Sequence, residues 1–215
     1  MSTPQRALVL VDIQQDYFNN SPLMIRYPNR VDSLAKITEA IDAAAAADIP
    51  VIMVQHTEGR GAPVFDPDSP GFAVRDEVLR RRRDSWKTVV KEFGSVYANT
   101  DVAQWLRERN VDTVTLVGYM TNNCVLASAV EGEGLGFSTE VLSDATGAIN
   151  IANDAGFADA EMVYTTLMTV LNSNFAAVAT TSDWAAALDA GRTLPRSDLG
   201  SSAIAGAEQA RIVGV

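Results

Sequence analysis

Short apolar runs rich in β-branched residues recur along the whole chain, and their order constrains the fold more than any other feature. Five runs lie at residues 7–13, 51–55, 111–117, 139–142 and 175–180, and a shorter one lies at 88–91. The runs are nearly continuous in hydrophobicity instead of alternating, which is typical of strands buried on both faces of a sheet. Helical patterns separate them at residues 31–47, 101–109, 124–133, 159–171 and 182–190. This alternation predicts an α/β fold, with a parallel sheet covered by helices on both faces.

The chain is long enough for one domain with a substantial core. We predict a single domain over residues 1–215, with its core at about 6–185 and a tail at about 191–215. The tail has scattered Gly, Ala and Ser, and we expect it to pack on a neighbour or to be loosely held. Segment 56–85 is the longest stretch without clear periodicity, and its glycines and prolines mark successive turns. Its apolar residues favour packing over disorder, so we expect it to form a wall or lid of the site.

The charge balance argues against nucleic acid or a membrane as the main partner. The formal net charge is -10 and the pI is near 4.5, whereas both partners require basic surfaces. The run Arg80–Arg83 is a local exception, interpreted as the solvated end of a helix, with a subunit contact or an anionic-ligand site as the alternative. No apolar run approaches the roughly 20 residues that span a bilayer. Residues 1–6 lack a signal-peptide core and one cysteine cannot form an internal disulfide, so we expect a cytoplasmic protein.

Three chemically different side chains lie at or just after the ends of predicted strands. Asp12 is near the end of the first run, Lys91 ends the short run, and Cys124 follows the run at 111–117. The carboxyl ends of parallel strands share one edge of a sheet, where ligands bind in such folds. A thiol at a strand-to-helix junction can be activated by the helix N-terminus, so Cys124 is a candidate nucleophile. Each residue alone has a structural explanation, but the combination favours a functional site.

The sequence around these positions resembles a known family. Residues 7–18, Lys91 followed by Phe93, and residues 118–125 are similar in order, spacing and context to the isochorismatase-like cysteine hydrolases. Weaker similarities follow at 144–146 and 175–184, so the resemblance covers roughly residues 6–185. It implies a three-layer α/β/α, Rossmann-like fold with six parallel strands in the order 3-2-1-4-5-6.

The resemblance also implies roles for individual residues. Asp12, Lys91 and Cys124 would form an Asp-Lys-Cys catalytic triad. In it the ammonium stabilises the thiolate, while Asp12 takes the thiol proton and later helps a water molecule attack the thioester. A cis peptide is implied between Tyr119 and Met120. An oxyanion hole is implied at the backbone N–H groups of Met120 and Cys124.

The chain departs from the metal-binding nicotinamidase branch of this family. The Asp-x-His pair of that branch corresponds here to Val54, Gln55 and His56, and the chain contains one histidine. A metal site of that kind cannot be built, so we expect no metal and no cofactor. His56 is interpreted as a structural or pocket-lining hydrogen-bond partner. Four further pocket candidates, each of which could instead belong to the core, are Phe18, Trp86, Tyr97 and Asn123.

The retained cysteine favours one reaction over its alternatives. Isochorismatases proper cleave a vinyl ether and do not need the thiol, so Cys124 favours attack on a carbonyl group. We predict an amidohydrolase that cleaves a C–N bond of a small amide, carbamoyl or ureido compound through a thioester intermediate. The alternatives are a vinyl-ether hydrolase, and a non-catalytic binding or redox-sensing protein on the same fold.

The sequence also bears on redox cofactors, on the substrate and on oligomeric state. A dinucleotide-dependent oxidoreductase is disfavoured, because the glycines at 132, 134 and 136 have the wrong spacing and follow a helix. We expect a small-molecule substrate and a homo-oligomer, a dimer or larger, with segment 56–85 or the tail helping to form the contacts.

Overall fold

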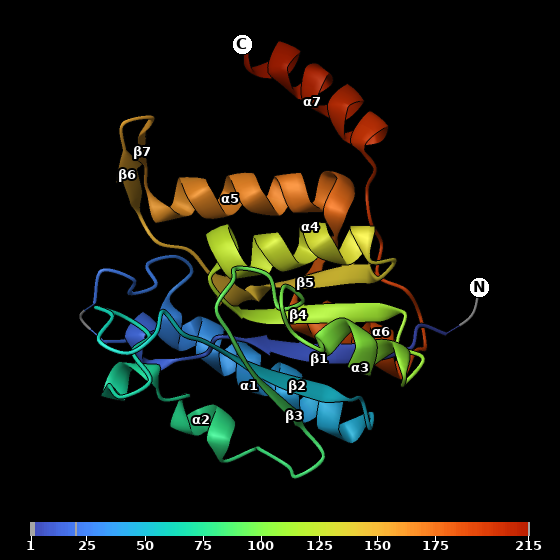
Figure 1. Cartoon of the computed structure of the whole chain (residues 1–215). Coiled ribbons are helices and arrows are strands. Elements are labelled where there is room, and N and C mark those ends of the chain that lie inside the picture. The colour runs from blue at the N-terminus through green and yellow to red at the C-terminus, as the bar shows by residue number, and fades with distance from the viewer. Residues whose placement is uncertain (1–2, 20, 215) are drawn as a thin grey trace.

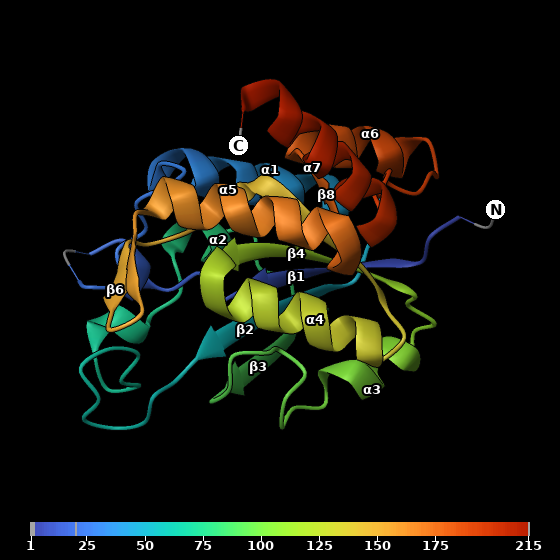
Figure 2. The same ribbon diagram turned by 90° about the horizontal axis from the view of Figure 1, so that it is seen from above.

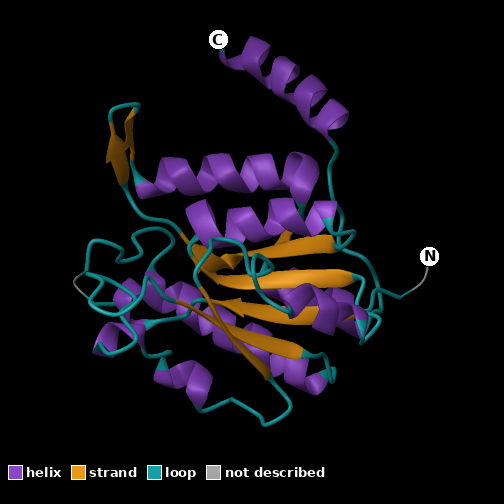
Figure 3. Ribbon diagram, viewed as in Figure 1, coloured by secondary structure: helices purple, strands orange, loops and turns teal. Residues whose placement is uncertain are grey.

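One parallel sheet organises the chain (Figure 3). The computed structural model describes residues 3–19 and 21–214, so the ends of the predicted domain 1–215 and residue 20 lie outside the described residues. Neighbouring strands of the sheet are parallel, and their order is β3-β2-β1-β4-β5-β8. Because β8 is the sixth of these strands along the chain, the predicted order is confirmed. The strands are β1 (Arg6–Val11), β2 (Val51–His56), β3 (Lys87–Lys91), β4 (Thr113–Tyr119), β5 (Ser138–Gly147) and β8 (Ala177–Ala179).

Helices cover both faces of the sheet (Figure 1 and Figure 2). The core on one face contains residues of α1 (Arg30–Ala46) and α6 (Thr181–Asp189). The core on the other face contains residues of α3 (Val102–Arg107), α4 (Leu126–Gly134) and α5 (Ala160–Val170). The predicted three-layer α/β/α fold is therefore confirmed. No helix in the described part of the chain is both long enough and apolar enough to cross a membrane.

The central strand β1 shows why the apolar runs do not alternate. All six of its residues are buried. Leu8 and Leu10 belong to the core beneath α1 and α6, while Ala7, Val9 and Val11 belong to the core on the opposite face. Both sides of the strand require apolar side chains, and full burial of each large one contributes about 1.5–3 kcal/mol.

Local signals set the boundaries of the first helix. Asn29 caps α1, since its side chain accepts a hydrogen bond from the backbone N–H of Val31. After the helix, Asp48 adopts a φ of 53°, a left-handed conformation in which Asp and Asn are enriched. Pro50 follows and cannot continue a helix, so the chain passes directly into β2.

Several short elements have no counterpart in the sequence prediction. They are α2 (Asp76–Leu79), the hairpin strands β6 (Ile151–Asn153) and β7 (Gly156–Ala158), and the single turns η1 (Gln15–Tyr17), η2 (Pro70–Phe72), η3 (Thr121–Val125) and η4 (Leu171–Phe175). Within the tail, residues Leu199–Val213 form the helix α7, which extends away from the sheet in Figure 1. Its alanines favour a helix, but it lacks the apolar periodicity that a sequence pattern needs for a prediction.

Candidate active site

The carboxyl edge of the sheet brings together the ends of four strands. β2 lies between β3 and β1, so His56 at the end of β2 is the register partner of Lys91 at the end of β3. Asp12 directly follows β1, and Cys124 follows β4 within the π-helical turn η3. Single π-helical turns inside or beside α-helices occur frequently at functional sites. Strand order therefore places these four residues at one edge.

The backbone conformation of two residues lets the strand ends approach closely. Gly118 in β4 pairs with Val11 in β1 and has a φ of 108°. A Cβ atom on Gly118 would lie 2.1 Å from the carbonyl oxygen of Val11, so the position requires glycine. Asp12 has a φ of 48°, which turns the chain out of β1. The peptide bond between Tyr119 and Met120 is cis.

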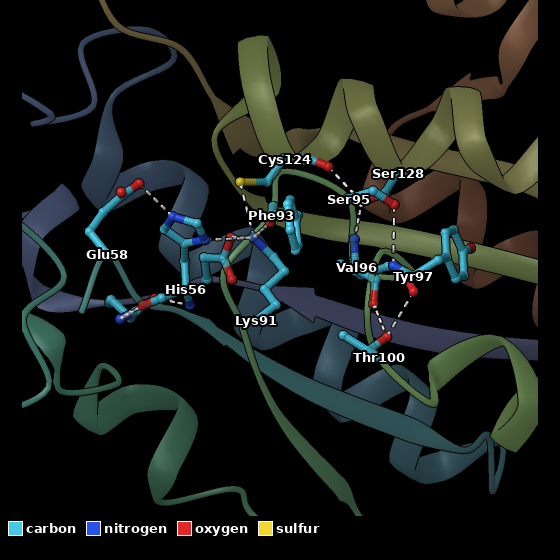
Figure 4. A network of polar contacts seen from close by, with 12 residues as sticks. His56, Glu58, Lys91, Phe93, Ser95, Val96, Tyr97, Thr100, Cys124 and Ser128 are labelled. Atoms are coloured by element: carbon cyan, nitrogen blue, oxygen red, sulfur yellow. Dashed lines mark hydrogen bonds and ion pairs between the residues drawn. The ribbon is translucent and has the colours of Figure 1, made fainter.

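The Lys91 ammonium lies at the centre of the site (Figure 4). Its Nζ is 2.8 Å from Asp12 Oδ2 and 3.3 Å from Cys124 Sγ. It is also 3.2 Å from His56 Nδ1 and 3.0 Å from the carbonyl oxygen of Phe93. The side chains of Lys91 and Asp12 are both fully buried, and each charge offsets the cost of burying the other. The structure thus brings Asp12, Lys91 and Cys124 together around one nitrogen atom.

The Cys124 thiol is protonated in this arrangement. Burial and, after it, the Asp12 carboxylate together raise the pKa of Cys124 to about 12, although the Lys91 ammonium opposes both. We expected the helix N-terminus to activate the thiol, but loss of hydration outweighs the favourable charges around it. A thiol of this kind needs a proton acceptor before it can act as a nucleophile. The neighbouring carboxylate of Asp12 is in place for that task.

His56 connects Lys91 to the surface of the protein. An ammonium can only donate, so Nδ1 of His56 accepts from Lys91 and Nε2 carries the ring hydrogen. Nε2 then donates to Glu58 Oε1 at 2.9 Å. The backbone of His56 is held by the Gln14 side chain, which accepts from His56 N at 2.7 Å and donates to His56 O at 3.0 Å. His56 is therefore hydrogen-bonded to Lys91, Glu58 and Gln14.

Glu58 is a site residue that sequence reasoning missed. It lies in the irregular segment 56–85, where no motif singles out one carboxylate among several. The available signal is its spacing, since residues i and i+2 of an extended chain point to the same side. This spacing predicts that the Glu58 side chain points to the same side of the chain as His56.

The other four pocket candidates separate into two groups. Phe18 is half-buried and its ring contacts Tyr119, with centroids 5.6 Å apart, while Asn123 is exposed in the turn before Cys124. Trp86 precedes β3 and lines a cavity at the opposite, amino edge of the sheet. Tyr97 stacks on Phe137 in the core, with centroids 5.8 Å apart. Asn123 thus lies beside Cys124 and Phe18 lies against Tyr119, whereas Trp86 and Tyr97 lie away from the site.

Aromatic rings form a wall of the site on the side of segment 56–85. The Phe65 ring lies 5.3 Å from the His56 ring and 5.2 Å from the Tyr17 ring, measured between centroids. The backbone N–H of Phe65 donates to Asp16 Oδ2 at 2.7 Å. Segment 56–85 therefore places the Phe65 ring beside His56 and Tyr17. Tyr17 and Asp16 lie in the stretch that carries the family resemblance, which is the signal that could have identified them.

The residues present do not fit the metal of the nicotinamidase branch. Val54 stands where that branch has a carboxylate and offers no ligand atom in its side chain. Across residues 3–19 and 21–214, no three His, Cys, Asp or Glu side chains are grouped so that they could hold a metal ion.

Comparison with known proteins agrees with this fold. A protein of Burkholderia xenovorans LB400, provisionally assigned as an isochorismatase, has a TM-score of 0.93 and is 40% identical, covering 99% of this chain and 100% of its own. An uncharacterised isochorismatase family protein of Bacillus subtilis is 29% identical over 177 residues, which are 81% of this chain and 96% of the relative. Ureidoacrylate amidohydrolase of Stutzerimonas stutzeri is 26% identical over 176 residues, 68% of this chain and 71% of the relative.

These similarities define a hydrolase built on a three-layer α/β/α sheet. The model of the isochorismatase domain matches residues 6–183. The chain belongs to the isochorismatase family.

Proposed function

We propose that this hydrolase cleaves a C–N bond of a small amide, carbamoyl or ureido compound through a thioester on Cys124. The observation that carries the proposal is the position of Lys91 Nζ, 2.8 Å from Asp12 Oδ2 and 3.3 Å from Cys124 Sγ. One buried ammonium thus joins a proton acceptor to a nucleophile. The names of two relatives, ureidoacrylate amidohydrolase and maleamate amidohydrolase, support C–N cleavage over cleavage of a vinyl ether.

In acylation the thiol proton passes to Asp12. The pKa of Cys124 near 12 means that this transfer accompanies attack instead of preceding it. Sγ bonds to the carbonyl carbon, and the negative charge that develops on the carbonyl oxygen meets the backbone N–H groups of Met120 and Cys124. When the C–N bond breaks, the leaving nitrogen takes the proton from Asp12. Lys91 keeps its protons throughout and stabilises the charge on sulfur.

Deacylation uses the same groups in reverse. A water molecule gives a proton to Asp12 as its oxygen attacks the thioester carbon. The C–S bond then breaks, the acid product leaves, and the sulfur recovers the proton. Asp12 is therefore the acceptor in both steps, and Asp12→Asn should impair both.

Replacement of Cys124 by alanine tests the proposal. We expect ammonia release from a panel of small amides and ureido compounds to fall by at least about a thousandfold, with the fold intact, because the nucleophile is lost and the new side chain is small. The matched control is Ser138→Ala, an exposed position at the start of β5, on the far edge of the sheet. Intact-protein mass spectrometry of a slowly deacylating variant should show the acyl adduct on Cys124.

Three results would contradict the proposal. The first is full activity of the Cys124→Ala protein. The second is inactivation by a chelator that added metal reverses. The third is neither ammonia nor an adduct with any compound in the panel, which would favour the vinyl-ether or the non-catalytic alternative. A redox sensor would be modified at Cys124 without releasing ammonia.

A further inference from the structure

Glu58 is a charged residue beside the site that the proposed mechanism does not use. Its Oε1 accepts from His56 Nε2 at 2.9 Å, and its side chain is 55% exposed. In Figure 4 the Cys124 sulfur points toward the side of His56 on which the Glu58 carboxylate lies. Because His56 is buried and held by Gln14, the hydrogen bond fixes a negative charge at the solvent side of the site.

The cations that contact site residues are already neutralised. Lys91 is paired with Asp12. Arg75, whose guanidinium lies 4.6 Å from the centre of the Phe18 ring, donates through Nε and Nη2 to Glu77 and through Nη1 to Gln15. Among the residues that the structure describes, the carboxylate of Glu58 makes no ion pair with a lysine or an arginine, and His56 is its partner.

The pKa of the Tyr17 hydroxyl depends on several of these charges. Burial raises the pKa of Tyr17 well above its usual value, and the charges of Asp12, Asp16 and Glu58, with that of Cys124 once its thiol has ionised, raise it further. Glu58 thus acts on the same buried region as Asp12 and the sulfur of Cys124. The charge of Glu58 therefore affects buried groups of the site, such as the Tyr17 hydroxyl, as well as the surface.

We propose that Glu58 determines specificity, making the site prefer compounds whose acyl part is uncharged over those that carry a carboxylate. Two like charges about 7 Å apart in a partly solvated site repel enough to change a rate by about five- to tenfold. The inference rests on the proposed function and narrows its substrate class. Neutral amides and carbamoyl compounds are favoured, and ureido acids are disfavoured.

Alkylation of Cys124 by two matched reagents tests the charge preference without requiring turnover. Iodoacetamide and iodoacetate share the same reactive carbon and are nearly equal in size, but only iodoacetate is charged. Intact-protein mass spectrometry follows both rates of alkylation. The rate with iodoacetamide divided by the rate with iodoacetate should be about five- to tenfold larger for the native protein than for the protein in urea. Glu58→Gln keeps an acceptor for His56 and removes the charge, so the ratio should fall to the value in urea.

The control is Asp84→Asn, which removes one exposed negative charge from the same segment without breaking a described ion pair. It should leave the ratio unchanged. The inference is overturned if the native ratio equals the ratio in urea, if Glu58→Gln has no effect, or if Asp84→Asn has the same effect as Glu58→Gln. Failure of both reagents to label native Cys124 at pH 9 also overturns the inference, because the thiol would then be inaccessible and the Glu58 charge could not select between molecules that reach it.

Turnover separates this inference from the proposed function. Succinamide and succinamate form a neutral and an anionic pair, and kcat/KM should favour succinamide by a similar factor in the native protein and not in Glu58→Gln. Charge-dependent alkylation without ammonia release from any amide would reject the proposed function and retain only the charge preference at Cys124. Ammonia release with equal kcat/KM for the two amides would reject the inference and retain the proposed function.

Discussion

Lys91 makes as many hydrogen bonds as its ammonium has hydrogens. An ammonium carries three hydrogens, and Nζ donates to Cys124 Sγ at 3.3 Å, to His56 Nδ1 at 3.2 Å and to Phe93 O at 3.0 Å. Asp12 Oδ2 lies 2.8 Å from Nζ as an ion pair, without the geometry of a hydrogen bond. In the proposed mechanism, loss of the thiol proton makes sulfur the stronger acceptor. The hydrogen bond from Lys91 to sulfur then strengthens without a change of partner.

Changes to the two charged neighbours of Cys124 should shift its pKa in opposite directions. Asp12→Asn removes a charge that raises the pKa of Cys124, so the pKa should fall below about 12. Lys91→Met removes the charge that lowers it, so the pKa should rise further. Below the pKa, the rate of alkylation by iodoacetamide increases with the fraction of thiolate, so rates compared at one pH between 7 and 10.5 show the direction of each shift. At pH 9 we expect Asp12→Asn to react faster than the native protein and Lys91→Met to react more slowly.

These variants also distinguish ionisation from catalysis. Asp12→Asn should hydrolyse amides more slowly even though its thiol ionises more readily, because the proton acceptor is lost. Each variant leaves one partner of a buried ion pair alone, at a cost of about 3–5 kcal/mol of stability. Circular dichroism must therefore show that both are folded under the assay conditions. Shifts of the Cys124 pKa in the same direction would refute the electrostatic account.

Among the secondary-structure elements, the contact between β1 and β4 controls the geometry of the site. β1 leads to Asp12 and β4 leads to Cys124, so the distance between these strand ends sets the distance between the two side chains. The contact depends on Gly118, which faces the backbone of Val11 without a Cβ atom. Gln14 adds a second constraint, since its side chain bonds to the backbone of His56 at the end of β2.

Gly118→Ala should therefore destabilise the fold and weaken the site together. The new Cβ would lie 2.1 Å from a backbone oxygen of Val11, and a φ of 108° is strained for alanine. We expect a loss of about 2–5 kcal/mol in the free energy of unfolding, measured by urea denaturation, and lower hydrolytic activity in the fraction that folds. The control is Gly134→Ala at the end of α4, where nothing lies within 4 Å of the new Cβ. It should be neutral or stabilising by up to about 1 kcal/mol; equal effects of the two changes would exclude the close approach as the cause.

At the scale of the whole molecule, α7 is a helix that the rest of the domain leaves exposed. Its described residues include none that are buried. Four apolar side chains along it are 60–77% exposed: Leu199, Ile204, Ile212 and Val213. A helix of 15 residues that buries none of its described residues is marginal in water, and exposed apolar side chains at a surface often mark an interaction site. The relative from Burkholderia xenovorans LB400 covers 99% of this chain, so it contains a counterpart of α7.

A homo-oligomer, a dimer or larger, remains our prediction for the assembled protein. Sedimentation velocity at micromolar concentrations should show a species larger than the 23.0 kDa chain. Truncation after Arg196 removes α7 while leaving every strand of the sheet in place, so it should lower the mass of the assembly if α7 forms the contact. A monomer across the whole concentration range would refute the prediction.

Local patterns in the sequence determined the layers, the strands and the three central residues of the site. Apolar runs buried on both faces require a covered parallel sheet, and the carboxyl ends of its strands bring Asp12, Lys91 and Cys124 to one edge. Tertiary packing alone decided the pKa of Cys124, the role of Glu58, and the separation of Trp86 and Tyr97 from the site. The physical reason is that periodicity and spacing depend on neighbours along the chain. The charge state of a thiol and the direction in which an aromatic ring points depend on groups that only the folded structure brings into contact.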